Sequence, residues 1–148
     1  MNGVTAWSVV RFAHVAGAAL WVGGQVALSL VVLPLARRLL EPEARSSFAR
    51  AAGQRFGLLT VIVFLPVQLG TGVAMAAHHG VTWGSLAEPG YGRTLAAKLG
   101  LFTVVMLAVA AHGWAHNHAR TDLARALALA SLVGSFGIVL LATALPTT

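Results

Sequence analysis

A few histidine, methionine and cationic side chains in this sequence have the type and spacing needed to bind a metal or a metal-containing cofactor. His14 lies in the apolar run RFAHVAGAALWVGG, and Met75 comes shortly before the pair His78 and His79 in a second apolar run. Imidazole and thioether groups serve as axial ligands of haem iron, and both also bind copper. The sequence therefore predicts a haem or metal site whose ligands come from these four residues.

Other kinds of site have little support in the sequence. The chain has no cysteine, which removes disulfides, thiolate metal sites and thiol catalysis. Its four carboxylates all fall in expected loops or at helix ends: Glu41, Glu43, Glu88 and Asp122. Acid–base or nucleophilic catalysis is therefore poorly supported, and any catalysis would come from a cofactor. Whether the protein is an enzyme stays open.

The composition is typical of an integral membrane protein. Of the 148 residues, 57% are hydrophobic and only 9% are charged, against about 25% charged residues in soluble domains. The net charge of +6 does not indicate nucleic acid, because the basic residues fall in short loops between apolar runs. The expected partner is the lipid bilayer.

Four apolar runs are long enough to cross a membrane, since a spanning helix needs about 20 apolar residues. They cover residues 12–36, 57–77, 96–115 and 123–145. The first is expected to be a retained helix rather than a cleaved signal peptide, because no basic leader or cleavage site accompanies it. Short loops favour antiparallel neighbours, so we expect one all-α domain over residues 1–148, an antiparallel four-helix bundle. The segment EPEAR (residues 41–45) should break the chain, and Pro66 should kink the second helix.

The distribution of basic residues predicts the orientation. Three lie on one side of the expected membrane, and seven lie on the other: Arg37, Arg38, Arg45, Arg50, Arg55, Arg120 and Arg125. Basic residues favour the cytoplasmic side. We therefore expect a multi-pass protein of the cytoplasmic membrane with both termini outside.

The polar residues of different spans are expected to meet near the outer face. Residues three, four or seven apart share one face of a helix, so His14 aligns with Trp21 and Gln25, and Gly72 aligns with Met75 and His79. The antiparallel arrangement places these groups and Lys98 at the same outer level. His112, His116 and His118 lie at the other end, about 10 Å or more from that level. Gln25 and Gln68 are expected to form hydrogen bonds between helices.

Structural roles are the alternative for each of these residues. Histidines near the interface, namely His78, His79, His116 and His118, are typical of side chains that face headgroups or water. Met75 is typical of core packing. Lys98 could reach outward to the headgroups, and His14 could be a core histidine bonded to a carbonyl. Ionisable residues inside a membrane are nevertheless costly and usually functional.

Two stretches of the chain resemble a known family. RFAHVAGAALWVGGQVALSLVVLP resembles the first helix of the CopD-type copper-resistance membrane domain, through His14, Trp21, Gly23-Gly24 and Pro34. YGRTLAAKLGLF, residues 91–102, is similar to a Tyr-Gly-Arg and Lys-Leu pattern of that family, and HemJ-type proteins are similar too. The resemblance implies copper handling or haem b binding, with His14 as a ligand and Arg93 and Lys98 as family-like residues. The AHGWAHNHA run, residues 111–119, departs from the pattern.

Three functions follow from these observations. We expect haem b between the helices near the outer face, for electron transfer or oxidase-type redox chemistry. His14 would be one axial ligand and His79, His78 or Met75 the other. The residues assigned to binding the cofactor are Arg11, Gly17, Trp21, Gly72, Arg93 and Lys98: the glycines make room for the macrocycle and the cations hold its propionates.

The alternatives are copper binding or transport, and a structural subunit without a cofactor. A copper permease is disfavoured because the chain has no cysteine and only three methionines, whereas Cu(I) prefers soft sulfur ligands. The protein would act as a homo-oligomer or as a subunit of a redox complex. The sequence leaves open the substrate, the electron donor, the oligomeric state and the role of the three histidines at the inner end.

Overall fold

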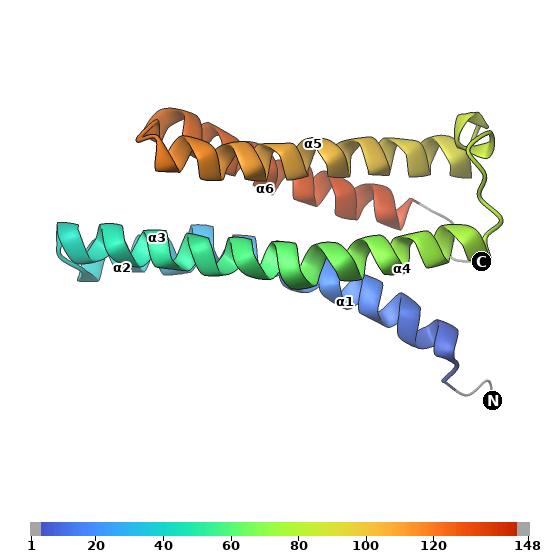
Figure 1. Cartoon of the computed structure of the whole chain (residues 1–148), viewed down its shortest axis with the longest axis horizontal. Coiled ribbons are helices and arrows are strands. Elements are labelled where there is room, and N and C mark those ends of the chain that lie inside the picture. The colour runs from blue at the N-terminus through green and yellow to red at the C-terminus, as the bar shows by residue number, and fades with distance from the viewer. Residues whose placement is uncertain (1–3, 145–148) are drawn as a thin grey trace. The chain divides into compact units, whose positions relative to one another are not determined.

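The computed structural model describes residues 4–144, and within this range every regular element is a helix. The chain divides into two compact units, one ending at His79 and the other beginning at Gly80. Four of the described helices are long and apolar enough to cross a membrane: Ala6–Leu39, Pro42–His78, Tyr91–Asn117 and Thr121–Thr143. Figure 1 shows these helices with their labels. The chain is thus an all-α protein with the features of a multi-pass membrane protein.

The first unit is a pair of antiparallel helices joined at Leu40 and Glu41. The first helix consists of α1 (Ala6–Ala27), a π-helical turn η1 (Leu28–Val32) and α2 (Leu33–Leu39). The second consists of α3 (Pro42–Leu59), a π-helical turn η2 (Thr60–Phe64) and α4 (Leu65–His78). Thr5 caps α1 in a capping box with Ser8. Pro42 begins α3, where its missing N–H is not needed.

Each π-helical turn directly precedes a Leu-Pro pair. The amide of Leu33 donates to the carbonyl of Leu28, and the amide of Leu65 donates to that of Thr60, five residues back. In a regular α-helix the ring of a proline clashes with the carbonyl four residues earlier. The wider turn shifts these carbonyls away from Pro34 and Pro66. The kink expected at Pro66 stays a prediction, and a π-helical turn stands before that residue.

The second unit is a helical hairpin preceded by a structured loop. The short 3-10 helix η3 (Ser85–Ala87) leads into α5 (Tyr91–Asn117), and a tight turn connects α5 to α6 (Thr121–Thr143). Gly92 is required by this loop, because an added Cβ would lie 1.9 Å from the carbonyl oxygen of Ser85. Small residues bring α5 and α6 together. An added Cβ on Gly134 would lie 2.4 Å from Val105 Cγ2, and Ser135 is fully buried.

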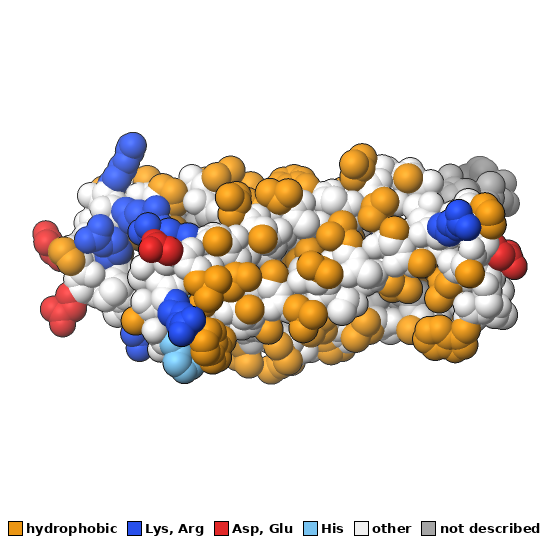
Figure 2. Space-filling view, turned by 90° about the horizontal axis from the view of Figure 1, so that it is seen from above, with side chains coloured by type: hydrophobic (Ala, Val, Ile, Leu, Met, Phe, Trp, Pro, Cys, Tyr) orange, Lys and Arg blue, Asp and Glu red, His pale blue; other side chains and the backbone are white. Residues whose placement is uncertain are grey.

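The observed helices extend beyond the predicted apolar runs. The largest difference concerns residues 42–56, which were expected to belong to a loop and instead form most of α3. Hydropathy marks where a chain can enter lipid, but a helix continues past that boundary wherever good helix formers follow. The predicted fourth span ended at Leu145, which lies outside the described residues; α6 ends at Thr143. In Figure 2, hydrophobic side chains cover the middle of the helices and charged side chains lie near helix ends.

Candidate functional site

His14 projects from α1 against α4, where two polar side chains hold it. Its Nδ1 atom lies 2.8 Å from Thr71 Oγ1. The hydroxyl of Thr71 donates its proton to the carbonyl of Val67, so in its bond with His14 this hydroxyl must accept. His14 therefore carries its proton on Nδ1, and the lone pair of the neutral ring is on Nε2. This is the tautomer in which imidazole binds a metal through Nε2 while a second group fixes the ring.

Gln68 makes the second contact at this position. Its Nε2 donates to the backbone carbonyl of His14 at 2.7 Å, and the residue is buried. The prediction that Gln68 forms a hydrogen bond between helices is thus confirmed. An added Cβ on Gly17 would lie 2.7 Å from the Gln68 Nε2 atom. The space left by Gly17 is therefore filled by the protein itself.

Gly72 lies beside the ring of His14. An added Cβ on Gly72 would lie 3.5 Å from His14 Cε1, which is ordinary van der Waals contact. The predicted pair His14 and Gly72 is therefore brought together, with the edge of the imidazole over a residue that has no side chain.

Trp21 is used in packing α1 against the second helix. Its indole nitrogen donates to Thr60 Oγ1 at 3.0 Å, and its ring stacks on Phe64 with centroids 4.6 Å apart. The side chain is 6% exposed. Both the polar and the apolar parts of Trp21 therefore already have protein partners, which is a structural role that the sequence analysis did not assign.

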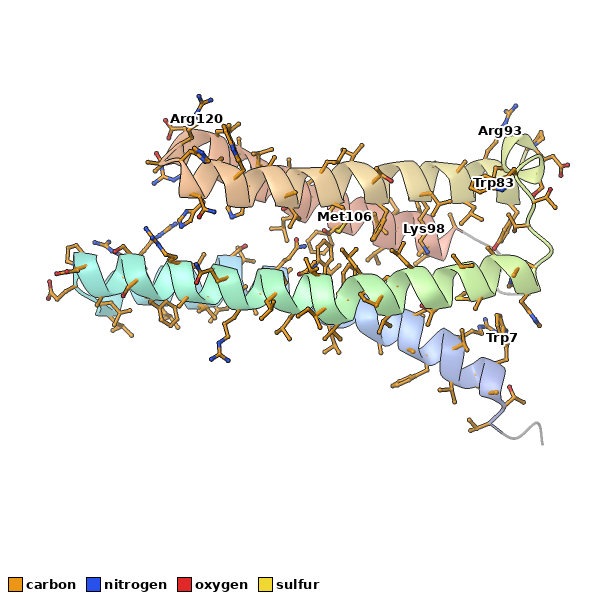
Figure 3. All side chains as sticks on the ribbon, viewed as in Figure 1. Trp7, Trp83, Arg93, Lys98, Met106 and Arg120 are labelled. Atoms are coloured by element: carbon orange, nitrogen blue, oxygen red, sulfur yellow. The ribbon has the colours of Figure 1, made fainter. Side chains whose placement is uncertain are left out.

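The other predicted metal ligands lie at the C-terminal end of α4. The imidazole of His79 donates from Nδ1 to the Met75 carbonyl at 2.8 Å, since a carbonyl can only accept. His78 stacks on Trp7 of α1 with ring centroids 3.9 Å apart, and Trp7 is labelled in Figure 3. His79 is eight residues beyond Thr71, a rise of about 12 Å, and Met75 is four residues beyond it, about 6 Å.

The three predicted cations belong to two different units. Arg11 is exposed and lies on α1, three residues before His14. Arg93 and Lys98 lie on α5 in the second unit. The Nε atom of Arg93 donates to the carbonyl of Ala87 at 3.3 Å, and Figure 3 shows its side chain at the end of α5 near the loop that carries Trp83. Lys98 is half-buried.

The histidines at the opposite end of α5 have local roles. His112 donates from Nδ1 to the carbonyl of Ala124 at 2.8 Å, which ties α5 to α6. His116 stacks loosely on His112, with centroids 6.4 Å apart. His118 donates to the carbonyl of Trp114. Across residues 4–144, no group of three or more His, Cys, Asp or Glu side chains gathers closely enough to hold a metal ion.

The residue that sequence reasoning missed at this site is Thr71. Thr71 directly precedes Gly72 in the second predicted span, at the edge of the polar face formed by Gln68, Gly72 and His79. One signal could have identified it. Thr71 carries a hydroxyl group, and it lies at the same expected depth in the membrane as His14 of the neighbouring antiparallel helix. Hydropathy does not supply that depth, because it depends on the register between the two helices.

Comparison with known proteins shows a related sequence in Aquifex aeolicus. No protein-family model matches the chain, and no solved structure matches it. An uncharacterized protein of Aquifex aeolicus (strain VF5) is 32% identical over 109 residues, which cover 73% of this chain and 69% of that protein. With that identity across more than two thirds of both sequences, the chain belongs to the same protein family as this Aquifex aeolicus protein.

Proposed function

We propose that this protein is a multi-pass protein of the cytoplasmic membrane that binds haem b through His14, for electron transfer or oxidase-type redox chemistry. In this proposal the four apolar helices form an antiparallel bundle with both termini outside. The observation that supports it best is the bond between His14 Nδ1 and Thr71 Oγ1, because it sets the tautomer in which Nε2 can coordinate iron.

The residues around His14 fit an axial ligand of haem in part. A hydroxyl holds the ring, and Gly72 presents no side chain next to the Cε1 edge. Arg11 is exposed one turn before His14 and would pair with a propionate. Gly17 would not make room for the macrocycle, since Gln68 occupies that space. Haem, when bound, would supply one-electron redox chemistry that the side chains alone lack.

The second axial ligand decides between the two kinds of chemistry. Two strong protein ligands suit electron transfer, whereas one ligand leaves a position for a small molecule. Met75 is the nearer candidate along α4, one turn beyond Thr71. His79 is two turns beyond it and is held in the tautomer with its lone pair on Nε2. The role of the chain is in either case to orient His14 and to surround the iron with apolar side chains.

The test is an absorbance spectrum of the purified protein in detergent, followed by metal analysis. We expect a Soret band that shifts on reduction, and iron at about one atom per chain by the one-site proposal. His14→Ala should lose most of this absorbance because it removes the axial nitrogen. His118→Ala is the matched control. His118 lies at the C-terminal end of α5 and bonds to the carbonyl of Trp114 in the same helix.

Two outcomes would contradict the proposal. A colourless wild-type protein that binds copper stoichiometrically would favour the copper-binding alternative. Equal loss of haem in the His14 and His118 variants would show that His14 has no special part in binding. Circular dichroism of each variant establishes that the helices are intact.

A further inference from the structure

The two helices of the first unit have apolar segments that end at different levels. In the second helix the apolar residues begin after Arg55, at Phe56. Phe56 lies beside Gly24 of the first helix, where an added Cβ would be 2.7 Å from the Phe56 ring. Beyond Gly24, however, the first helix stays mostly apolar through Ala36, with Gln25 and Ser29 as its polar residues. These dozen or so residues correspond to about 18 Å of helix.

This stagger gives the unit an end that reaches beyond the hydrocarbon core. The two helices of the unit contain 34 and 37 residues, or about 50 Å each, against about 30 Å of hydrocarbon. If Trp7 and His78 mark one membrane boundary, the opposite boundary falls near Ala27 and Gly57. The remaining part, which we name the tip, consists of η1, α2 and most of α3, residues 28–56.

The tip has one apolar side and one polar side. The apolar side belongs to η1 and α2, where Val31, Leu35 and Leu39 follow one another at intervals of four residues and are 52%, 48% and 77% exposed. The polar side belongs to one face of α3, where Ser46, Ser47 and Arg50 are exposed; the exposed Phe48 lies on another face of that helix. Two exposed arginines, Arg37 and Arg38, stand between the last two leucines of α2. A helical element with an apolar face and adjacent arginines is typical of one that lies in the membrane interface.

We propose that the first unit tilts in the bilayer, as helices longer than the hydrocarbon core do, and that the tip thereby docks on the anionic headgroup region. The side of α2 enters the interface through Val31, Leu35 and Leu39, and Arg37 and Arg38 contact lipid phosphates. The side of α3 faces water. The argument for lipid is the combination of the exposed apolar stripe with net positive charge: five arginines lie in the tip against two carboxylates, Glu41 and Glu43. Negative surface potential attracts such basic residues close to a membrane.

Environment-sensitive labels can test this proposal directly in the whole chain. The sequence has no cysteine, so Leu35→Cys and Ser47→Cys each give one labelling site for the fluorophore NBD. The two positions lie on the apolar and polar sides of the same tip. Each labelled protein is reconstituted into vesicles of POPC alone and of POPC with POPG. Quenching is measured with aqueous iodide and with nitroxide-labelled lipid.

The expected result is different quenching at the two positions. The label at position 35 should be quenched by nitroxide lipid, more strongly with POPG, and the label at position 47 by iodide. Adding POPG should increase nitroxide quenching at position 35. Arg37→Gln and Arg38→Gln should each reduce this increase about fivefold, which corresponds to the contribution of one basic residue. Arg50→Gln on the α3 side should change it less. Val31→Cys serves as a second apolar position if Leu35→Cys does not fold.

Three results would overturn the proposal. Quenching of position 35 by iodide would place the apolar side in water. Protection from both quenchers would mean that protein covers it. Disulfide formation between the unlabelled Leu35→Cys residues of two chains, in the presence of an added oxidant, would identify a second copy as that protein. An equal response in POPC and POPC with POPG would remove the role of anionic lipid. None of these results depends on whether His14 binds haem.

Discussion

At the scale of single residues, Thr71 fixes the ring of His14, which we propose as a haem ligand. Its hydroxyl both donates to Val67 and accepts from His14, so it selects one tautomer of the ring. Partners of this kind typically change metal affinity by about 10- to 100-fold when they are lost. The nearly isosteric change Thr71→Val removes the acceptor and keeps the volume.

We therefore expect Thr71→Val to weaken haem binding by at least about tenfold, and Thr71→Ser to restore most of it. Haem titration of the apoprotein gives the affinity, and the reduction potential gives a second measure that reflects the orientation and basicity of the ligand. If both quantities stay at the wild-type values in Thr71→Val, then Thr71 does not position His14.

The same scale shows which residues could be predicted from the sequence. The polar residues His14 and Gln68 were identifiable because polar groups in an apolar run need partners, and Gln68 does pair with α1. The partner of Trp21 was not identifiable. Its bond to Thr60 and its stacking on Phe64 depend on the register between the two helices. Periodicity within one helix places Thr60 and Phe64 on a common face, but it does not show that Trp21 lies opposite them.

At the scale of elements, close packing of α5 on α6 depends on residues without side chains. Because Val105 is 2% exposed and stiff at its branched carbon, it cannot move aside for a new methyl group at Gly134. We expect Gly134→Ala to destabilise the hairpin by about 1–3 kcal/mol. The measurement is thermal or denaturant unfolding in detergent.

Gly100→Ala is the control for that change. Gly100 lies in α5 of the same hairpin, but an added Cβ there would have no atom within 4 Å. Alanine favours a helix over glycine by up to about 1 kcal/mol, so this variant should be unchanged or more stable. Similar stability of the two variants would mean that the contact between Gly134 and Val105 does not limit the packing.

The extent of α3 shows where hydropathy fails as a predictor of elements. Residues 42–56 begin with Pro42 and Glu43, a proline in the first position and a carboxylate in the first turn, which both favour the start of a helix. They are also polar, so a method that follows apolar runs assigns them to a loop. Helix propensity and compatibility with lipid are separate properties of a segment, and only the second ends at the membrane boundary.

At the scale of the whole molecule, composition was sufficient for the class of protein and insufficient for the arrangement. Apolar content adds up along a segment, so four spanning helices can be identified without any contact being known. Which side chains meet depends on register and on irregular turns. The contact of Phe56 with Gly24, for example, reveals the staggered apolar segments, although the sequence contains no motif for it.

The predicted orientation, with both termini outside, can be measured because the chain has no cysteine of its own. Ser47→Cys on α3 and Ala87→Cys in the loop before α5 introduce single exposed thiols on the two expected sides. In intact cells an impermeant maleimide should label position 87 and not position 47, and lysis should make both reactive. We expect this labelling pattern because α2 and α3 contain an excess of arginine, and basic residues resist transfer across the membrane. Labelling of position 47 alone in intact cells would invert the topology, and it would place the arginines of the tip on the opposite leaflet.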